Sequence, residues 1–427
     1  MKYKNIILIL SSTIYCNVEL DSLVTLINQQ KYLEVVDYVD EMIEEKKDLN
    51  DTFFKKASES AFILDEFDKS IQYLKKAIAI NDNKDYRNLW DEIVRMRKDI
   101  EIALKMYTEE NKFDESIVEF NKLKKQYPYC ALIEYNLGKI YQQEELYDSA
   151  IENFQNAVKL NPYREKYKMS LNYIIGRFIG EGDEYYSMRD FESAIEKYLF
   201  AYENISNNPI LIFKIAKTYY FLKEYDKSRD MLEVLVSISS DHYEGYKLLG
   251  DVYKRLGDKT SALEKYLHSI EVNDKYEKAY LAVGQMYYSE GESNKALEYL
   301  NLAIEIKKDY SKAYETAGMV YENMEDYTKA IYYYEQTVSY DRRNYKAMSR
   351  LSSVYNNLSK YDFAKKYAKD CIKIKRSYPD AYYELGIAEK GLGNRIAAIS
   401  AFDNAKKSSR WRKLAQYEID QIKKELD

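Results

Sequence analysis

Few residues in this 427-residue sequence can break regular structure, because it contains only 13 glycines and 4 prolines. Average usage of about 7% glycine and 5% proline would give several tens of them in a chain of this length. A fold of many short strands needs more tight turns than these residues can form, so their scarcity excludes it and favours long helices. Because the chain is longer than one compact core normally allows, we expect several domains or one extended array.

Cysteine and histidine are also scarce. Cys16, Cys130 and Cys371 lie far apart and form no CxxC pair, and neither His242 nor His268 has a partner at metal-ligand spacing. This excludes a disulfide framework and a zinc site, and we interpret Cys130 and Cys371 as thiols packed in a core. No GxxxxGK sequence follows a strand, and no carboxylate pair stands out. We therefore predict that the chain is not an enzyme and has no catalytic residues, cofactor or metal.

An excess of basic charge is absent as well. Lysine and arginine number 65 against 71 aspartates and glutamates, which gives a net charge of -6 with both signs interspersed. Nucleic-acid binding requires a clustered basic excess, so we predict no nucleic-acid partner. Apolar residues make up 46% of the chain, which is enough to form a core and argues against intrinsic disorder.

The first sixteen residues differ from the rest of the chain. Lys2 and Lys4 precede an apolar stretch from Ile6 to Ile14, which has the length of a signal-peptide core and is too short to span a bilayer. We predict a signal peptide over residues 1–16 and export to the periplasm or cell envelope. Cys16 is then either the residue before the cleavage site or, since the stretch before it resembles a degenerate lipobox, a lipidated first residue. The alternative is a buried amphipathic first helix in a cytoplasmic protein. No other segment is apolar enough to cross a membrane, so we expect membrane contact only through the lipid or an uncleaved signal.

A block of similar residues recurs every 34 positions in the second half of the sequence. Each copy has an aromatic residue, then glycine, then in most copies a second tyrosine, at Tyr246–Tyr253, Tyr280–Tyr287, Tyr314–Tyr321 and Tyr382–Gly386. A second block follows each copy, with alanine and then a large apolar side chain, as in Ala262 with Tyr266 and Ala398 with Phe402. Repetition at this period is typical of a helical array.

These blocks resemble the tetratricopeptide repeat (TPR), and the resemblance covers nearly the whole chain. It implies an all-α, right-handed α-solenoid of about eleven helix-turn-helix repeats with a C-terminal capping helix. We predict two degenerate repeats over residues 17–84, two repeats over 97–164 and seven contiguous repeats over 175–412, which start at 175, 209, 243, 277, 311, 345 and 379. Residues 85–96 and 165–174 are helical interruptions, and 413–427 form the capping helix.

The physical basis of the pattern is a shared apolar seam. Places four, seven, eight and eleven of each repeat fall on one helix face, and places twenty, twenty-four and twenty-seven fall on one face of the next helix. Small residues at places eight and twenty allow close approach, the tyrosine at place eleven fills the gap between neighbouring pairs, and each pair therefore needs its neighbours. We predict that aspartates in the turns cap the second helices, namely Asp148, Asp226, Asp258, Asp326 and Asp362. Around Gly176, Gly180 and Gly182 we expect close helix packing, or alternatively a flexible joint.

The resemblance also implies a partner site along the first helices of the repeats. In the family, partners contact places two, five, nine and twelve or thirteen, on the inside of the superhelix. We predict that a protein or peptide partner contacts an aromatic groove with scattered charges, formed by Tyr135, Lys139, Tyr186, Phe213, Lys217, Tyr220, Lys247, Asp251, Lys254, Leu281, Gln285, Tyr288, Lys312, Glu315, Met319, Arg350, Asn356 and Tyr383. The subclass that grips chaperone C-termini is not expected, because it has asparagine after the glycine, where this chain has Lys139, Asp251, Gln285 or Met319.

Two functions remain open from the sequence. The first is a non-catalytic interaction scaffold that holds its partner in the groove. The second is a structural or assembly protein of the cell envelope, tethered near Cys16 and acting through its ends and convex face.

Overall fold

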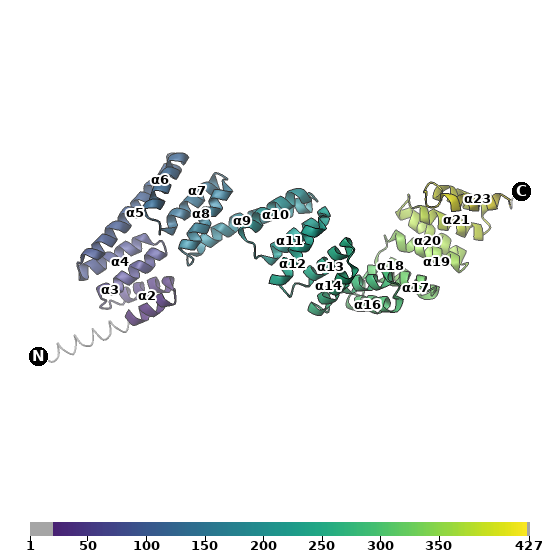
Figure 1. Ribbon diagram of the computed structural model, residues 1–427, viewed down its shortest axis with the longest axis horizontal. Helices are drawn as coiled ribbons and strands as arrows, with labels where there is room; N and C mark the ends of the chain where they lie inside the picture. The colour runs from purple at the N-terminus through teal and green to yellow at the C-terminus, as the bar shows by residue number, and fades with distance from the viewer. Residues whose placement is uncertain (1–19, 425–427) are drawn as a thin grey trace. The chain divides into compact units, whose positions relative to one another are not determined.

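The computed structural model describes residues 20–424, and over that range every regular element is a helix (Figure 1). Residues 20–28 are helical. The labelled helices are α2 (Tyr32–Glu44), α3 (Asp51–Ile63), α4 (Phe67–Ile80), α5 (Lys84–Thr108), α6 (Phe113–Gln126), α7 (Ala131–Gln143), α8 (Tyr147–Leu160), α9 (Glu165–Ser187), α10 (Phe191–Asn204), α11 (Pro209–Leu222), α12 (Tyr225–Ile238), α13 (Tyr243–Leu256), α14 (Lys259–Val272), α15 (Glu277–Ser289), α16 (Ser293–Ile306), α17 (Ser311–Asn323), α18 (Tyr327–Tyr340), α19 (Tyr345–Asn357), α20 (Tyr361–Ile374), α21 (Pro379–Gly391), α22 (Arg395–Ala405) and α23 (Arg412–Lys424).

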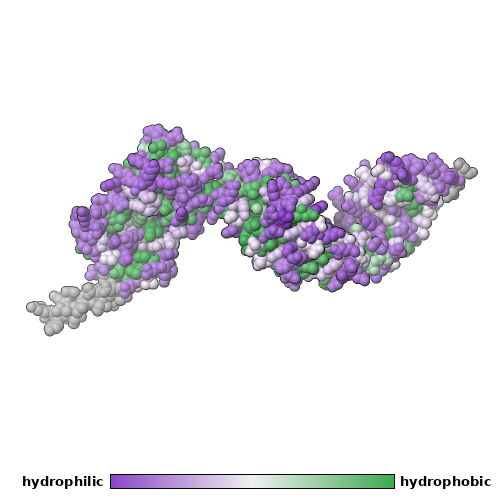
Figure 2. Space-filling view, viewed as in Figure 1, coloured by the Kyte–Doolittle hydropathy of each residue, from purple (hydrophilic) through white to green (hydrophobic). Residues whose placement is uncertain are grey.

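The chain forms two compact units, residues 1–180 and 181–427, and the boundary between them falls within α9. In both units, hydrophilic side chains cover most of the visible face and apolar side chains appear in bands between them (Figure 2). The predicted signal peptide, Cys16 and the end of the predicted capping segment lie outside the described residues. The predicted division into sub-arrays at residues 85–96 and 165–174 stays a prediction.

The C-terminal unit is a stack of helix pairs. Its first helices begin at 34-residue intervals, where the predicted repeats start, at Pro209, Tyr243, Glu277, Ser311, Tyr345 and Pro379. The last helix, α23, buries Ala415, Ile419 and Ile422 against the pair α21 and α22. The prediction of an all-α solenoid of helix pairs with a final capping helix is therefore confirmed.

Glycine at place eight is explained by packing within each pair. A Cβ atom built on Gly318 would lie 2.6 Å from the ring of Tyr334, and one on Gly250 would lie 2.5 Å from the ring of Tyr266. Both rings are almost completely buried. The small residue thus makes room for the large side chain at place twenty-four of the partner helix, and this locks the two helices in register.

Tyrosine at place eleven joins neighbouring pairs, as the sequence predicts. Tyr253, Tyr287 and Tyr321 each pack against the buried clusters of two successive pairs. Tyr253 also donates a hydrogen bond to Glu233 of the preceding helix at 2.8 Å. Each pair therefore covers the apolar face of the next, which is the packing that a helical array requires.

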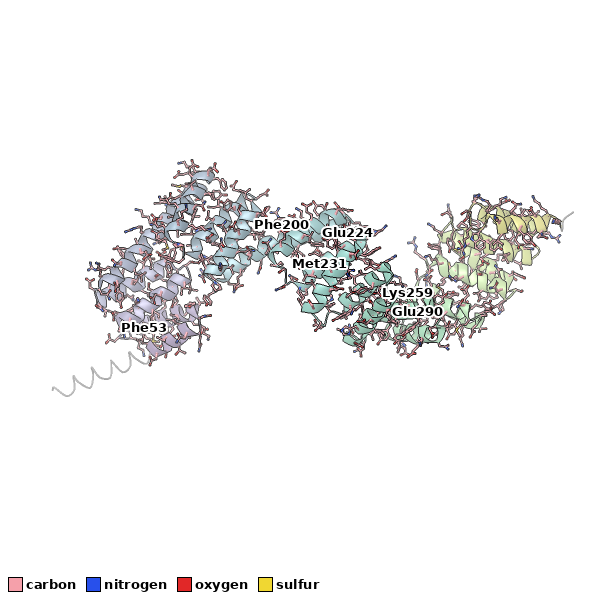
Figure 3. All side chains as sticks on the ribbon, viewed as in Figure 1. Phe53, Phe200, Glu224, Met231, Lys259 and Glu290 are labelled. Atoms are coloured by element: carbon pink, nitrogen blue, oxygen red, sulfur yellow. The ribbon has the colours of Figure 1, made fainter. Side chains whose placement is uncertain are left out.

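The N-terminal unit departs from a simple chain of neighbour contacts. Its core contains Phe53 of α3, labelled in Figure 3, which is fully buried. The turn after α3 contacts the start of α9, about a hundred residues further on: Asp65 accepts a hydrogen bond from the Tyr167 hydroxyl and lies 3.2 Å from Lys166 Nζ. In addition, the rings of Tyr32 and Tyr163 meet edge to face at 5.1 Å. In this unit, the expectation that each pair contacts only its neighbours is wrong.

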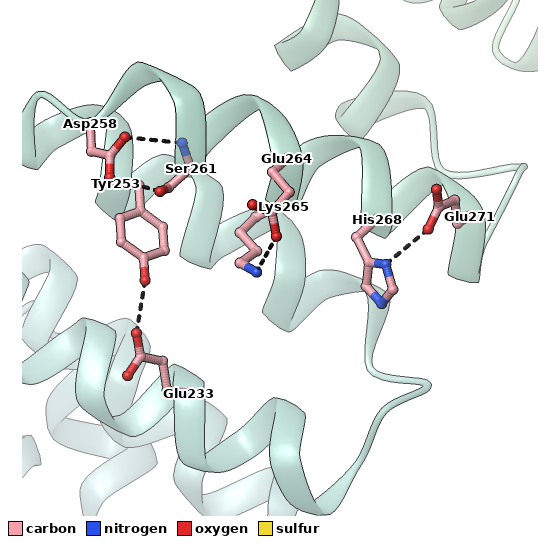
Figure 4. Close-up of polar contacts among 8 residues, drawn as sticks. All are labelled: Glu233, Tyr253, Asp258, Ser261, Glu264, Lys265, His268 and Glu271. Carbon is pink, nitrogen blue, oxygen red and sulfur yellow. Dashed lines mark hydrogen bonds and ion pairs between the residues drawn. The ribbon is translucent and has the colours of Figure 1, made fainter.

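The turn aspartates cap only some of the second helices. Asp258 is an N-cap and accepts the Ser261 backbone N–H at 3.0 Å (Figure 4). Asp326 is likewise an N-cap and accepts the Lys329 backbone N–H at 3.1 Å. The prediction is wrong for Asp148, Asp226 and Asp362, because each follows a tyrosine that already begins the helix. These three carboxylates lie in the first helical turn, where they interact favourably with the positive end of the helix dipole instead.

The glycines around residue 180 do not share one role. A Cβ atom on Gly182 would lie 2.5 Å from the Tyr198 ring, so close packing is confirmed there. Gly176 and Gly180 have no atom within 4 Å of such a position, although both lie inside α9. Close packing therefore does not explain Gly176 and Gly180, and each lowers local helix stability by about 0.5–1 kcal/mol relative to alanine.

Both described cysteines are core thiols. Cys130 and Cys371 are 4% and 0% exposed, and the Cys371 thiol donates to the Tyr345 carbonyl at 3.1 Å. Burial raises the pKa of each thiol to about 12, which keeps both protonated and unreactive. Within residues 20–424, no helix combines the length and the apolar character that a bilayer crossing requires.

Candidate partner-binding groove

Two hollows open on the first-helix side of the C-terminal unit. The lysine hollow, about 510 Å³ in volume, is lined by Lys247, Asp251, Lys254, Tyr266, Glu277, Lys278, Leu281, Ala282, Gln285, Lys307, Asp309, Tyr310, Ser311 and Lys312. The glutamate hollow, about 400 Å³ in volume, is lined by Glu315, Met319, Glu322, Lys346, Ser349, Arg350, Ser353, Tyr378, Asp380, Glu384, Arg410 and Trp411. Helix α17 contributes residues to both hollows, so they lie side by side along the array.

The lysine hollow has an excess of positive charge. Five lysines line it against three carboxylates, a formal difference of +2. One of these carboxylates already has partners inside the protein. Asp251 lies 2.5 Å from Lys247 Nζ and accepts a hydrogen bond from the Tyr266 hydroxyl at 2.8 Å. Lys254 and Lys312 form no ion pair with any of the described residues. This hollow can therefore accept a negatively charged group.

The glutamate hollow holds ordered charge pairs. Arg350 lies 3.0 Å from Glu322, which also accepts the Tyr334 hydroxyl at 2.5 Å. Arg410 lies 3.0 Å from Asp380. Two carboxylates of this hollow, Glu322 and Asp380, are thus already paired with a guanidinium group.

Glu384 has a different environment in the same hollow. Its Oε2 accepts a hydrogen bond from Asn356 Nδ2 at 2.8 Å, and Ser353 donates a second. Burial, reinforced by the nearby Asp380 and Glu322 carboxylates, raises the pKa of Glu384 to about 6. No ion pair joins Glu384 to a cation among residues 20–424.

Several predicted groove residues contact other side chains of the protein itself. Lys217 Nζ lies 5.1 Å above the Tyr186 ring, and Phe213 packs against His242 at 4.8 Å. Burial raises the pKa of Tyr186 to about 12. Tyr383 stacks on Trp411 with ring centres 4.0 Å apart. The rings of Tyr186, Phe213 and Tyr383 line neither of the two hollows, and they present less free surface than the sequence suggests.

The remaining predicted residues fall in several places. Tyr135 and Lys139 belong to the N-terminal unit, where Tyr135 packs against Tyr167 and Lys139 lines a separate hollow. Asn356 is 8% exposed, so it supports Glu384 rather than facing solvent. Arg350 occupies the sixth place of its repeat, which is not one of the places that the family resemblance implies for it.

The structure adds hollow-lining residues that sequence reasoning missed. Lys278 and Lys346 occupy the second place of their repeats, so the place rule could have found them. Glu384 occupies a sixth place, as Arg350 does. Arg410 and Trp411 lie at the end of the last repeat, after α22, and line the glutamate hollow just before α23. No rule based on the repeat reaches these last two residues.

Metal and thiol chemistry find no support in the described residues. No group of three histidine, cysteine, aspartate or glutamate side chains in residues 20–424 could hold a metal ion. His242 caps α13, with Nδ1 accepting the Gly245 N–H at 3.0 Å. His268 Nδ1 lies 2.9 Å from Glu271 on the surface of α14 (Figure 4). Both histidines thus contact residues three positions further along the chain.

Stacked helix pairs with charged hollows on the side of their first helices define a helical-repeat solenoid. Family models identify the repeat: a tetratricopeptide repeat matches residues 135–164, the C-terminal ARM domain of tetratricopeptide repeat protein 21 matches 258–350, and the fifth ARM repeats domain of the same protein matches 316–423. The chain thus contains tetratricopeptide repeats. Its fold is that of protein-interaction scaffolds.

Individual relatives match only in part. The small glutamine-rich tetratricopeptide repeat-containing protein 2 of Saccharomyces cerevisiae is 30% identical over 92 residues, which are 22% of this chain and 27% of that protein. Anaphase-promoting complex subunit 3 of Schizosaccharomyces pombe is 25% identical over 31% of this chain and 18% of its own length. The chain thus spans less than a third of each of these relatives. A solved TPR fragment from Cytophaga hutchinsonii is 18% identical, with a TM-score of 0.45 over 56% of this chain and 98% of its own.

Proposed function

We propose that this chain is a non-catalytic scaffold that binds a peptide or an extended segment of a partner protein along the first helices of its C-terminal unit. The observation that carries the proposal is that two charged hollows, both lined by residues of α17, together extend over the first helices α13, α15, α17, α19 and α21. Lys278, Lys312 and Lys346 stand at the second place of three successive repeats, so the same type of contact recurs at each step. An extended segment suits such a repeating surface.

A charge-reversal pair tests this proposal on the full chain. Linear random peptides displayed on phage are selected against the protein, and the best peptide is synthesised and its affinity measured by fluorescence anisotropy. The groove variant changes Lys254, Lys278 and Lys312 to glutamate. The control variant changes the exposed second-helix residues Lys259, Lys295 and Lys329 to glutamate, which alters the net charge by the same amount.

We expect the groove variant to weaken binding at least about tenfold and the control to change it less than about twofold, since charges in a groove act at short range. Equal effects of the two variants would mean that binding depends on net charge alone and would refute the groove. A selection that enriches no peptide would refute peptide binding altogether.

We also propose that the chain is exported to the cell envelope, which rests on Lys2, Lys4 and the apolar stretch from Ile6 to Ile14. Cell fractionation of the full chain and of a Cys16→Ala variant tests the location. A chain found in the cytoplasm refutes export. Loss of envelope association in Cys16→Ala, with groove binding intact, would favour the tethered structural role instead.

A further inference from the structure

Glu384 lacks a cation, whereas two of the other three carboxylates in its hollow have one. Within the glutamate hollow, Glu322 lies 3.0 Å from Arg350, and Asp380 lies 3.0 Å from Arg410. Glu384 receives only neutral donors, from Asn356 and Ser353. Withdrawing a carboxylate from water without a counter-charge costs free energy, so a cation that reached Glu384 would recover that cost.

A second acceptor beside Glu384 also lacks a partner. Asn356 uses Nδ2 to donate to both the side chain and the backbone carbonyl of Glu384, at 2.8 and 2.9 Å. Its Oδ1 is buried and has no donor among the described residues, and the side chain as a whole is only 8% exposed. Buried acceptors in folded proteins are normally paired. The pair Glu384 and Asn356 is therefore short of donors.

The net charge of the lining residues indicates the charge of the missing group. Four carboxylates and three basic side chains line it, a formal difference of -1. One monovalent cation neutralises this difference, whereas a polyamine would exceed it and meet Arg350 and Arg410. Met319 and Trp411 also line the hollow and offer apolar surface to the aliphatic stem of a long basic side chain.

We propose that the glutamate hollow binds the side chain of a lysine or arginine in the partner segment, with the ammonium or guanidinium group donating to Glu384. This inference rests on the proposed function, because it takes the occupant to be part of an extended partner. It assigns Glu384 as a recognition residue and Asn356 as the residue that positions it.

Peptide selection on matched variants tests the inference. Linear random peptides are selected against the full chain, against Glu384→Gln and against Glu305→Gln, an exposed glutamate of α16 with the same change of charge. We expect lysine or arginine at one fixed position of the peptides selected by the unmodified chain and by Glu305→Gln, and no such preference with Glu384→Gln. A basic preference that is absent from the unmodified chain, or that persists in Glu384→Gln, would overturn the inference.

The other outcomes separate the inference from the function on which it rests. Peptides that bind in the groove without a basic preference overturn the inference and leave the scaffold standing. A failure to enrich any peptide overturns both. Micromolar spermidine that displaces the selected peptide would assign the hollow to a free polyamine and refute a peptide side chain as its occupant.

A neutral isostere and a pH series locate the contact. Replacing the basic residue of the selected peptide by citrulline should weaken binding to the unmodified chain at least about tenfold and leave binding to Glu384→Gln nearly unchanged. Since burial raises the pKa of Glu384 to about 6, the carboxylate is mostly ionised at pH 7 and mostly protonated at pH 5. For a histidine-free peptide, affinity should therefore fall about tenfold from pH 7 to pH 5.

The groups facing Glu384 set the background for the pH series. They are Glu315 and Glu322 on α17, Lys346 and Arg350 on α19, Tyr378 and Asp380 at the start of α21, and Arg410 before α23. None of them is a histidine. A fall in affinity that is equally large in Glu384→Gln would assign the titration to another group and count against the inference.

Discussion

Replacing Gly318 by alanine tests whether packing requires the glycine of each repeat. The added Cβ atom would lie 2.6 Å from Cε1 and 2.7 Å from Cδ1 of Tyr334, well inside the roughly 3.5–4.0 Å at which carbon atoms attract best. Tyr334 is fully buried, and its hydroxyl donates to Glu322 at 2.5 Å. The ring cannot turn away without losing that hydrogen bond, so α17 and α18 must separate.

Two opposing effects set the magnitude. Overpacking a close-fitting core costs about 1–3 kcal/mol, and the short contacts with a buried, hydrogen-bonded ring place this substitution in the upper part of that range, at about 2–3 kcal/mol. Alanine favours a helix over glycine by about 1 kcal/mol. We therefore expect Gly318→Ala to lower the free energy of unfolding by about 1–2 kcal/mol. Gly180→Ala is the control, because its Cβ atom meets nothing within 4 Å inside α9, and it should raise helix stability by about 0.5–1 kcal/mol.

Urea unfolding followed by circular dichroism measures the overall effect, and hydrogen exchange with mass spectrometry measures the local one. Gly318→Ala should speed exchange in α17 and α18 first, because neighbour contacts carry the stability of the array. A Gly318→Ala protein as stable as the unmodified chain would refute the packing explanation. So would a Gly180→Ala protein that is destabilised to the same degree.

Three further predictions concern carboxylates. Burial raises the pKa of Glu384 to about 6, above its usual 4.5. The ionised carboxylate therefore destabilises the fold above pH 6, and this effect is lost below about pH 4.5. Glu384→Gln should raise the free energy of unfolding by up to about 2 kcal/mol at pH 8 and leave it unchanged at pH 4. Asp258→Ala should lower the free energy of unfolding by about 1 kcal/mol through loss of the helix cap, and Asp226→Ala should lower it by only a few tenths of a kcal/mol. Urea unfolding at low salt measures both values. Equal losses would contradict the assignment of caps. Asp65→Asn keeps a residue that tolerates the positive φ of 58° but removes the charge beside Lys166. It should lower the free energy of unfolding by about 1–3 kcal/mol, which would be seen as faster proteolysis of the turns around residues 65 and 163. Unchanged proteolysis would mean that this contact does not stabilise the fold.

The repeat itself could be predicted because packing acts at fixed sequence spacing. Glycine at place eight and the large residue at place twenty-four are sixteen positions apart in six of the pairs, so the constraint is visible in one sequence. The same regularity gave the first-helix starts from Pro209 to Pro379. The cap predictions failed at Asp226 because one residue of helix phase decides whether a carboxylate precedes or enters the helix.

The glutamate hollow was hidden because its contacts cross repeats. Asn356 and Glu384, in successive repeats, are 28 positions apart, and Trp411, in the turn before α23, packs on Tyr383. The Asp65 turn meets Tyr167 across 102 positions. None of these pairs leaves a periodic signal. Place rules from the family lead to several residues that line the two hollows, such as Lys254 and Lys312. Which tyrosines are covered by their neighbours depends on side-chain packing that periodicity does not encode.

The order of charge along the groove gives it a direction. The lysine hollow, with a formal difference of +2, spans α13 to α17, and the glutamate hollow, with a difference of -1, continues from α17 to α21 and Trp411. An extended partner with an acidic group at one end and a basic group at the other fits in one orientation, and reversal brings like charges together in both hollows. Like-charge contacts discriminate more strongly than favourable ones attract. Because helix α17 belongs to both hollows, a fixed distance between the two charged groups of the partner should be selected together with their order.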